Sequence, residues 1–261
     1  MTMAFHKTVI AFDLYGTLLS TESIARELAR LFGDDAAKPL AALWRRYQLE
    51  YTWRINSMGK VFLPNIYLVK LTPPGTYRTF SDITRGALHH AVAETGLAIS
   101  ENAADKLMEA YNALHVFPEI PTALELVAGT PNVEATIFSN GTDAMVSASV
   151  ATSPDLKPYA SLFKGLVTVD GPGVQVFKPD KRTYDHLVRE VGKEGVPGDV
   201  WVVSANPFDA VGATAAGLKA AWIDRLGKGW VDRLGDVIGG VRPALVVDCV
   251  DEAVREIIKQ S

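Results

Sequence analysis

The sequence predicts an α/β fold in which a parallel sheet is interrupted, after its first strand, by a block of helices. After Pro118, short apolar segments alternate with helical ones, a pattern typical of parallel strands that are covered on both faces. Between residues 21 and 115 we find only helical periodicity. One β-branched segment precedes that block, so we expect a single core built from both ends of the chain.

The first expected strand is the run KTVIAFD at 7–13, which is rich in β-branched residues and stops abruptly at Asp13. Four helices follow, because apolar residues recur at helical spacing in each of them, and Gly33 ends the first. These helices are expected at 23–33, 39–58, 83–97 and 101–114.

The remainder of the chain alternates between the two kinds of segment. Compact apolar runs predict strands at 133–139, 165–169, 200–204, 219–224 and 244–248. Helices are expected at 122–129, near 143–150, at 179–191, near 209–217 and after the last strand. This order predicts a core domain formed by residues 1–20 and 116–261, and a helical domain formed by residues 21–115.

Composition narrows the class of protein. The chain carries 26 Lys and Arg against 30 Asp and Glu, a formal net charge of -4, so the electrostatic basis for nucleic-acid binding is missing. Its one cysteine, Cys249, excludes an intramolecular disulfide framework and a cysteine-rich zinc site. No segment reaches the ~18 apolar residues of a membrane span, and the N-terminal apolar run is too short for a signal peptide. We therefore expect a soluble cytoplasmic protein with no nucleic-acid or membrane partner.

Polar side chains gather where the expected strands end, which is where ligands bind in open parallel sheets. They are Asp13, Tyr15, Gly16 and Thr17; Ser139, Asn140 and Gly141; and Ser204, Asn206 and Asp209, with Lys178 before a helix. We expect them to line one crevice. The sequence has no GxSxG elbow, no Walker loop and no GxGxxG turn, which weakens the hydrolase-triad, nucleotide and dinucleotide alternatives.

Four segments in this order resemble the motifs of the haloacid dehalogenase superfamily, namely AFDLYGTLLS, IFSNGT, FKPDKRTY and SANPFD. The strings DLYGT and SNGT, together with LWRRYQLEYTW in the helical block, look like the (S)-2-haloacid dehalogenases, and the similarity spans about 8–60 and 77–225. The resemblance implies a Rossmann-like parallel-sheet core with an α-helical cap inserted after the first strand.

The activity implied by the resemblance is hydrolytic dehalogenation of short (S)-2-haloalkanoic acids to (R)-2-hydroxy acids, through an ester formed on Asp13. It implies a small-molecule 2-haloacid substrate and no metal or organic cofactor, and it allows a homodimer. Two alternatives stay open: a Mg²⁺-dependent phosphatase of the same superfamily, and a non-catalytic relative. Against the phosphatase stands Tyr15, which replaces the second aspartate, because a phenol with a pKa of about 10 is no metal ligand at neutral pH.

The resemblance also assigns catalytic roles. Asp13 matches the nucleophile, and Thr17 would hydrogen-bond its carboxylate. Arg45 would face the leaving halide, for which a delocalised guanidinium is well suited. Lys178 would offset the repulsion between two aspartates and keep Asp13 ionised. The fourth motif would orient Lys178 and the hydrolytic water, with Asp209 assisting that water; its residues are Ser204, Asn206 and Asp209.

Further positions match the substrate pocket of the family. Ser139 would hold the substrate carboxylate, and Asn140 would contact the halide. The remaining matches are Leu14, through its backbone amide, Tyr184, and the apolar wall residues Tyr15, Leu49, Phe80 and Phe208. The family often has Trp where Phe208 stands, which bears on the size of the pocket rather than on the chemistry.

The match is interrupted by the string VFLPNIYLVKLTPPGT, residues 61–76. This segment is mostly apolar and lies near Phe80 in the sequence, so one interpretation is a loop that gates the pocket. The alternatives are that it has no role, or that it is an intron translated in frame. Sequencing the transcript decides the last of these, because a message that contains the segment rules it out.

Overall fold

The computed structural model of this protein describes residues 7–58, 77–171 and 173–261. The atypical insertion expected at 61–76 lies outside these residues.

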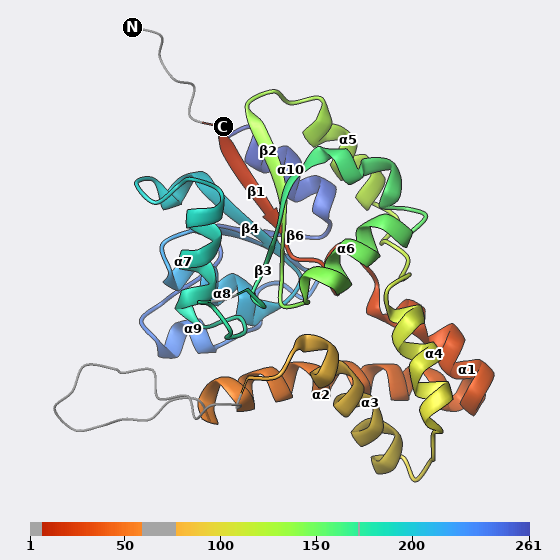
Figure 1. Ribbon diagram of the computed structural model, residues 1–261. Helices are drawn as coiled ribbons and strands as arrows, with labels where there is room; N and C mark the ends of the chain where they lie inside the picture. Colours follow the sequence, from red (N-terminus) through yellow and green to blue (C-terminus); the bar gives the residue numbers. More distant parts are fainter. Residues whose placement is uncertain (1–6, 59–76, 172) are drawn as a thin grey trace, which may run out of the picture.

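A six-stranded parallel sheet forms the centre of the molecule, with the strand order β3-β2-β1-β4-β5-β6 (Figure 1). The sequence-based prediction of an α/β fold with a parallel sheet is therefore confirmed. The strands are β1 (Thr8–Phe12), β2 (Val133–Ser139), β3 (Phe163–Thr168), β4 (Val200–Ser204), β5 (Lys219–Ile223) and β6 (Leu245–Val247). The last strand is shorter than expected because it lies at the edge and pairs only with β5.

The chain reverses its direction of travel across the sheet at β1, which pairs with β2 on one side and with β4 on the other. In such sheets the crevice for a ligand opens where the carboxyl ends of these neighbouring strands diverge. The amide of Asp13 donates to the carbonyl of Val203 at 3.0 Å, so the ladder with β4 continues one residue beyond β1. Asp13 is thereby placed at the mouth of the crevice.

Helices cover both faces of the sheet. Helices α5 and α10 pack together on one side, and α7 and α8 pack together on the other (Figure 1). The core helices are α5 (Ile120–Ala128), α6 (Asp143–Thr152), α7 (Lys181–Glu190), α8 (Pro207–Ala215), the short α9 (Leu234–Val237) and α10 (Val250–Ile258), with 3₁₀ turns at Lys157–Leu162 and Pro197–Asp199. None of the helices in the described ranges carries an apolar stretch long enough to cross a bilayer.

The block inserted after β1 is helical, as predicted, and its helices pack mainly on one another. We call it the cap; it consists of a 3₁₀ turn (Thr21–Ile24), α1 (Ala25–Phe32), α2 (Asp34–Met58), α3 (Phe80–Glu94) and α4 (Glu101–Tyr111). Helix α2 begins at Asp34, five residues before the start predicted at Pro39. Pro39 is therefore the sixth residue of the helix, where it removes one backbone hydrogen-bond donor without ending the helix.

The cap is tied to the core on both sides of the undescribed segment 59–76. At the end of α2, the side-chain amide of Asn56 donates to the carbonyl of Phe177 at 2.6 Å and accepts from its amide at 3.0 Å. Before α3, the hydroxyl of Tyr77 donates to Asp170 at 2.7 Å, and its ring stacks on that of Phe177. Both contacts fix the strand-to-helix connection that leads to Lys178.

Candidate active site

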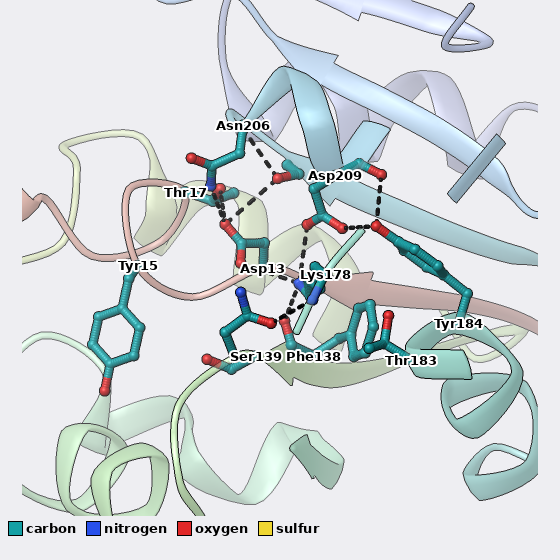
Figure 2. Close-up of polar contacts among 12 residues, drawn as sticks. Asp13, Tyr15, Thr17, Phe138, Ser139, Lys178, Thr183, Tyr184, Asn206 and Asp209 are labelled. Carbon is teal, nitrogen blue, oxygen red and sulfur yellow. Dashed lines mark hydrogen bonds and ion pairs between the residues drawn. The ribbon is translucent and has the colours of Figure 1, made fainter. Parts of the chain in front are cut away.

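Asp13 lies at the end of β1 with only 7% of its surface exposed, and its two carboxylate oxygens have different surroundings (Figure 2). Oδ2 accepts from the hydroxyl of Thr17 at 2.7 Å and from the side-chain amide of Asn206 at 2.8 Å, with the hydroxyl of Ser204 at 3.5 Å. Oδ1 faces the ammonium of Lys178 at 3.2 Å. Neutral donors therefore hold Oδ2, whereas Oδ1 contacts the cation of Lys178.

The loop that follows Asp13 is tightly turned and fixed from behind. The carbonyl of Leu14 accepts the amides of Leu18 and Leu19, and Gly16 adopts a φ of +90°, which glycine reaches without strain. Arg225 donates to the carbonyl of Thr17 at 2.7 Å from the end of β5. This turn aims the Thr17 hydroxyl back at the carboxylate.

Lys178 is buried and makes full use of its three ammonium hydrogens. It donates to Asp13 at 3.2 Å, to the carbonyl of Phe138 at 2.7 Å and to Asp209 at 2.9 Å. The Phe138 ring lies 3.9 Å from the ammonium nitrogen, a cation–π contact. An ammonium with three fixed acceptors in a buried site cannot rotate freely, so Lys178 holds the two carboxylates at a set separation.

Asp209 lies in the first turn of α8 and has no exposed surface. Burial raises the pKa of Asp209, and the charge of Lys178 opposes that rise. The hydroxyl of Tyr184 donates to Oδ1 of Asp209 at 2.9 Å (Figure 2), and burial raises the pKa of Tyr184 well above its ordinary value. Tyr184 thus acts as a donor that orients Asp209.

Arg45 reaches the site from the cap. Its Nη2 donates to the carbonyl of Tyr15 at 2.8 Å, and its Nη1 donates to Oε1 of Gln48 at 2.6 Å. Among the described residues, no carboxylate oxygen lies within 4 Å of a nitrogen of this guanidinium. The guanidinium of Arg45 therefore binds the loop at Tyr15, two residues after Asp13, and it has no ion-pair partner among the described residues.

Aromatic rings form the apolar side of the site, at the boundary between the cap and the core. The ring of Tyr15 lies 6.0 Å from that of Phe80 and 5.4 Å from that of Tyr111. Its hydroxyl pairs with Ser149 at 3.2 Å and points away from Asp13 (Figure 2), and burial raises the pKa of Tyr15. A protonated phenol that points away from Asp13 cannot serve as the second metal ligand of a phosphatase.

The structure gives three of the predicted residues different contacts from those expected. Ser204 and Asn206 hold Asp13 rather than Lys178, because their side chains project from the end of β4 across the turn after β1. Tyr184, expected in the substrate pocket, is fully buried behind Asp209. In these cases the spacing along the chain correctly predicts which residues lie close together. The twist of the sheet then determines which atom each side chain contacts.

The other predicted residues lie around the same crevice. The carbonyl oxygen of the Asn140 side chain accepts from the amide of Lys178 at 2.9 Å, so its NH₂ end faces the opposite way. The hydroxyl of Ser139 accepts from the amide of Gly141 at 3.0 Å. Leu14 and Phe80 are buried and Leu49 is half-buried. Phe208 meets Trp53 edge to face at the rim, beside a cavity of about 490 Å³.

Sequence reasoning missed Gln48, Asn56 and Arg225. Gln48 lies three residues after Arg45 and is fully buried, so a polar residue at i+3 on an inward helix face is the signal that could have indicated it. The partners of Asn56 and Arg225 are more than 100 residues away in the sequence, and no local pattern marks them. In the described part of the chain, no group of three His, Cys, Asp or Glu residues is arranged to hold a metal ion.

The chain is similar in sequence and in structure to proteins that have been named for their activity. The family model described as haloacid dehalogenase-like hydrolase matches residues 7–217. An (S)-2-haloacid dehalogenase of Pseudomonas sp. strain YL is 32% identical over 221 residues, covering 84% of this chain and 83% of that protein. The L-2-haloacid dehalogenase of Xanthobacter autotrophicus superposes with a TM-score of 0.78 at 26% identity, covering 98% of this chain and 100% of that one. The structure of that enzyme with chloropropionic acid covalently bound superposes with a TM-score of 0.77 at 28% identity and the same coverage.

Proposed function

The chain belongs to the haloacid dehalogenase-like hydrolases, and we propose that it converts short (S)-2-haloalkanoic acids to (R)-2-hydroxy acids by hydrolytic dehalogenation. The relatives named as (S)-2-haloacid dehalogenases support this assignment. The observation that carries it is that the guanidinium of Arg45, which has no carboxylate partner among the described residues, binds the loop that follows the buried carboxylate of Asp13. A nucleophile and an anion acceptor are what displacement of a halide requires.

In the first step, Oδ1 of Asp13 attacks C2 of the substrate on the side opposite the halogen. A bond forms between Oδ1 and C2, the carbon–halogen bond breaks, and the halide leaves with its electron pair, which inverts C2. The ammonium of Lys178 lies 3.2 Å from Oδ1 of Asp13 and holds that oxygen in place. The guanidinium of Arg45 and the NH₂ end of Asn140 receive the halide. We assign Oδ1 this role because Oδ2 is already occupied by Thr17 and Asn206.

In the second step, water adds to Cγ of Asp13 while Asp209 takes one of its protons. The negative charge develops on Oδ2, where the hydroxyl of Thr17 and the amide of Asn206 already donate, an arrangement that stabilises such an oxyanion. The bond between Cγ and Oδ1 then breaks, and the product alkoxide takes the proton from Asp209. Asp13 returns with one oxygen from water and releases the second proton of that water to the solvent.

The remaining residues shape the pocket for a short carboxylic acid. The hydroxyl of Ser139, together with backbone amides, would hold the substrate carboxylate. Leu49, Phe80 and the ring of Tyr15 supply apolar surface for the carbon skeleton. We propose that residues 21–115 act as the cap domain of this site and that residues 1–20 and 116–261 act as the core domain.

The decisive experiment measures halide release from (S)- and (R)-2-chloropropionate, with the chirality of the product and hydrolysis of p-nitrophenyl phosphate determined in parallel. We expect halide only from the (S) substrate and (R)-lactate as the product. Phosphate release without halide release would instead assign the chain to the phosphatases of the superfamily.

Activity is expected to survive EDTA. The position that supplies the second metal carboxylate in the phosphatases is Tyr15, whose hydroxyl is turned toward Ser149. Halide release measured before and after dialysis against the chelator should agree within error. A full loss that Mg²⁺ restores would contradict the proposed mechanism.

The Arg45→Ala variant is expected to lower kcat on (S)-2-chloropropionate by about 10²-fold or more, as removal of a positioned charge does. The attraction between Arg45 and the halide grows as charge builds on the leaving atom, so kcat suffers more than substrate binding does. Arg45→Lys should rescue poorly, because a compact, strongly hydrated ammonium cannot keep both neutral contacts of the guanidinium.

The matched control is Arg46→Ala on the same helix. The Arg46 side chain is 60% exposed and lies 3.6 Å from Glu94, away from the site. It should retain most of the activity. If Arg46→Ala is the damaging change and Arg45→Ala is mild, the helix face that we assign to the halide is the wrong one.

A further inference from the structure

We propose that Gln48 is the positioning residue for Arg45, because its side-chain carbonyl fixes the guanidinium while leaving the positive charge available to a monatomic anion. The inference rests on the proposed function and extends it to a residue that is expected to touch neither the substrate nor the halide. It also names the property of position 48 that matters, which is neutrality together with a hydrogen-bond acceptor.

The hydrogen bonds around Gln48 fix the orientation of its amide. The side chain is fully buried, and its Nε2 lies 2.7 Å from the hydroxyl oxygen of Thr84. That hydroxyl already donates its hydrogen to the carbonyl of Phe80 at 2.6 Å, so toward Gln48 it can only accept. The NH₂ group must therefore face Thr84, and the carbonyl oxygen must face Arg45.

The side-chain carbonyl oxygen of Gln48 accepts two hydrogen bonds from other residues of the cap. It accepts from Nη1 of Arg45 at 2.6 Å and from the hydroxyl of Tyr111 at 3.1 Å. The other contact of the guanidinium is the carbonyl of Tyr15 at 2.8 Å. Two acceptors at different nitrogens determine the plane of a rigid guanidinium, which a single acceptor would leave free to turn.

Neutral partners distinguish Arg45 from the other arginines in the described part of α2. Arg46 lies near Glu94, and Arg54 pairs with Glu50 on the exposed side of the helix. At Arg45 both oxygens are uncharged, so neither hydrogen-bond partner reduces the attraction of the cation for an anion. A carboxylate at position 48 would hold the guanidinium equally well and would cancel that attraction.

The test compares variants of the full-length protein that separate charge from shape. Gln48→Glu preserves the shape and adds a charge, Gln48→Met removes the acceptor without a charge, and Thr84→Val removes the acceptor on the far side of the amide. Gln260→Glu at the exposed end of the chain controls for the added charge itself. The measured quantities are kcat on (S)-2-chloropropionate and (S)-2-bromopropionate, the inhibition constant of bromide, bromide binding by calorimetry, and Tm.

Gln48→Glu is expected to lower kcat on the chloro substrate by about 10²-fold. The bromo substrate should lose less, by about tenfold, because bromide is the better leaving group and depends less on an interaction made in the transition state. The inhibition constant of bromide should rise by about tenfold or more, since the interaction lost is made to the halide itself. Gln48→Met should change the two kcat values and the bromide inhibition constant in the same direction. If Gln48→Glu does not fold, Gln48→Met alone tests the inference.

A role limited to packing would give a different result. It would lower Tm and leave the chloro-to-bromo ratio and the bromide constant at wild-type values in both Gln48 variants, and that result overturns the inference. Thr84→Val, which removes the acceptor that orients the Gln48 amide, should shift both quantities in the same direction as the Gln48 variants. If the wild type releases no halide from either substrate, the proposed function fails, and calorimetric binding of bromide to the wild type and to Gln48→Glu still tests the inference.

Discussion

The Asp13→Asn variant is expected to lose halide release by about 10⁴-fold or more, as removal of a covalent nucleophile does, while keeping its fold. An asparagine is nearly isosteric with aspartate, and its carbonyl oxygen still accepts from Thr17 and Asn206 at the Oδ2 position. Lys178 keeps Asp209 and the carbonyl of Phe138 as acceptors. The amide, however, has no charged oxygen to direct at C2.

Halide release measured with an ion-selective electrode, together with Tm, checks this expectation. Asp105→Asn is the matched control, because Asp105 pairs with Arg85 on the exposed surface of the cap and has no part in the crevice. A single turnover of wild-type enzyme in H₂¹⁸O should place the label in Asp13 and leave the first product unlabelled. Label found only in that product would favour direct attack by water and would contradict the ester mechanism.

The Asp209→Asn variant is expected to separate the two steps. Asp13 and Lys178 remain, so the ester should form and release one halide per protein molecule. Hydrolysis of the ester should then slow by about 10²- to 10⁴-fold, the usual contribution of a general base. Intact mass spectrometry should show the added acyl group on Asp13. An absence of both the halide burst and the mass increase would show that Asp209 is needed for the first step as well.

The same substitution is expected not to lower Tm at pH 7. Burial raises the folded-state pKa of Asp209 above the ordinary value of 3.8. A carboxyl whose pKa is raised stabilises the fold at pH values below its unfolded pKa, and this contribution is lost as pH rises through the folded pKa. At pH 7 the ionised Asp209 is therefore a cost to the fold, and asparagine removes it while leaving Lys178 paired with Asp13. A Tm several degrees below that of the wild type would contradict this reasoning.

The sequence was informative about the core because its strands and their ends are local features. The run that ends at Asp13 and the run that ends at Ser204 are each recognisable alone, and parallel pairing then brings both ends to one edge of the sheet. The contacts made by each side chain were less predictable. Whether Asn206 reaches Asp13 or Lys178 depends on the twist and stagger of β4 against β1, which no pattern in the sequence records.

The cap was predicted as helical with Arg45 on its inward face, but the polar residues beside Arg45 were not identified. Helical periodicity places Leu49 and Trp53 on the same helix face as Arg45, yet Gln48 also lies on the inward side and accepts a hydrogen bond from Arg45. A single buried glutamine does not alter an amphipathic pattern, so periodicity is insensitive to it. Asn56 pairs with Phe177 across 121 positions of the chain, a contact that exists only once the cap is docked.

The two anchors formed by Asn56 and Tyr77 have a consequence for how this chain can change over evolutionary time. Both ends of the intervening stretch are bonded to the connection that precedes Lys178, so the spacing of the ends is set by the core and not by the number of residues between them. Insertions and deletions between Asn56 and Tyr77 therefore leave the positions of both anchors unchanged, so this interval of the sequence is a place where lineages of this protein can diverge in length.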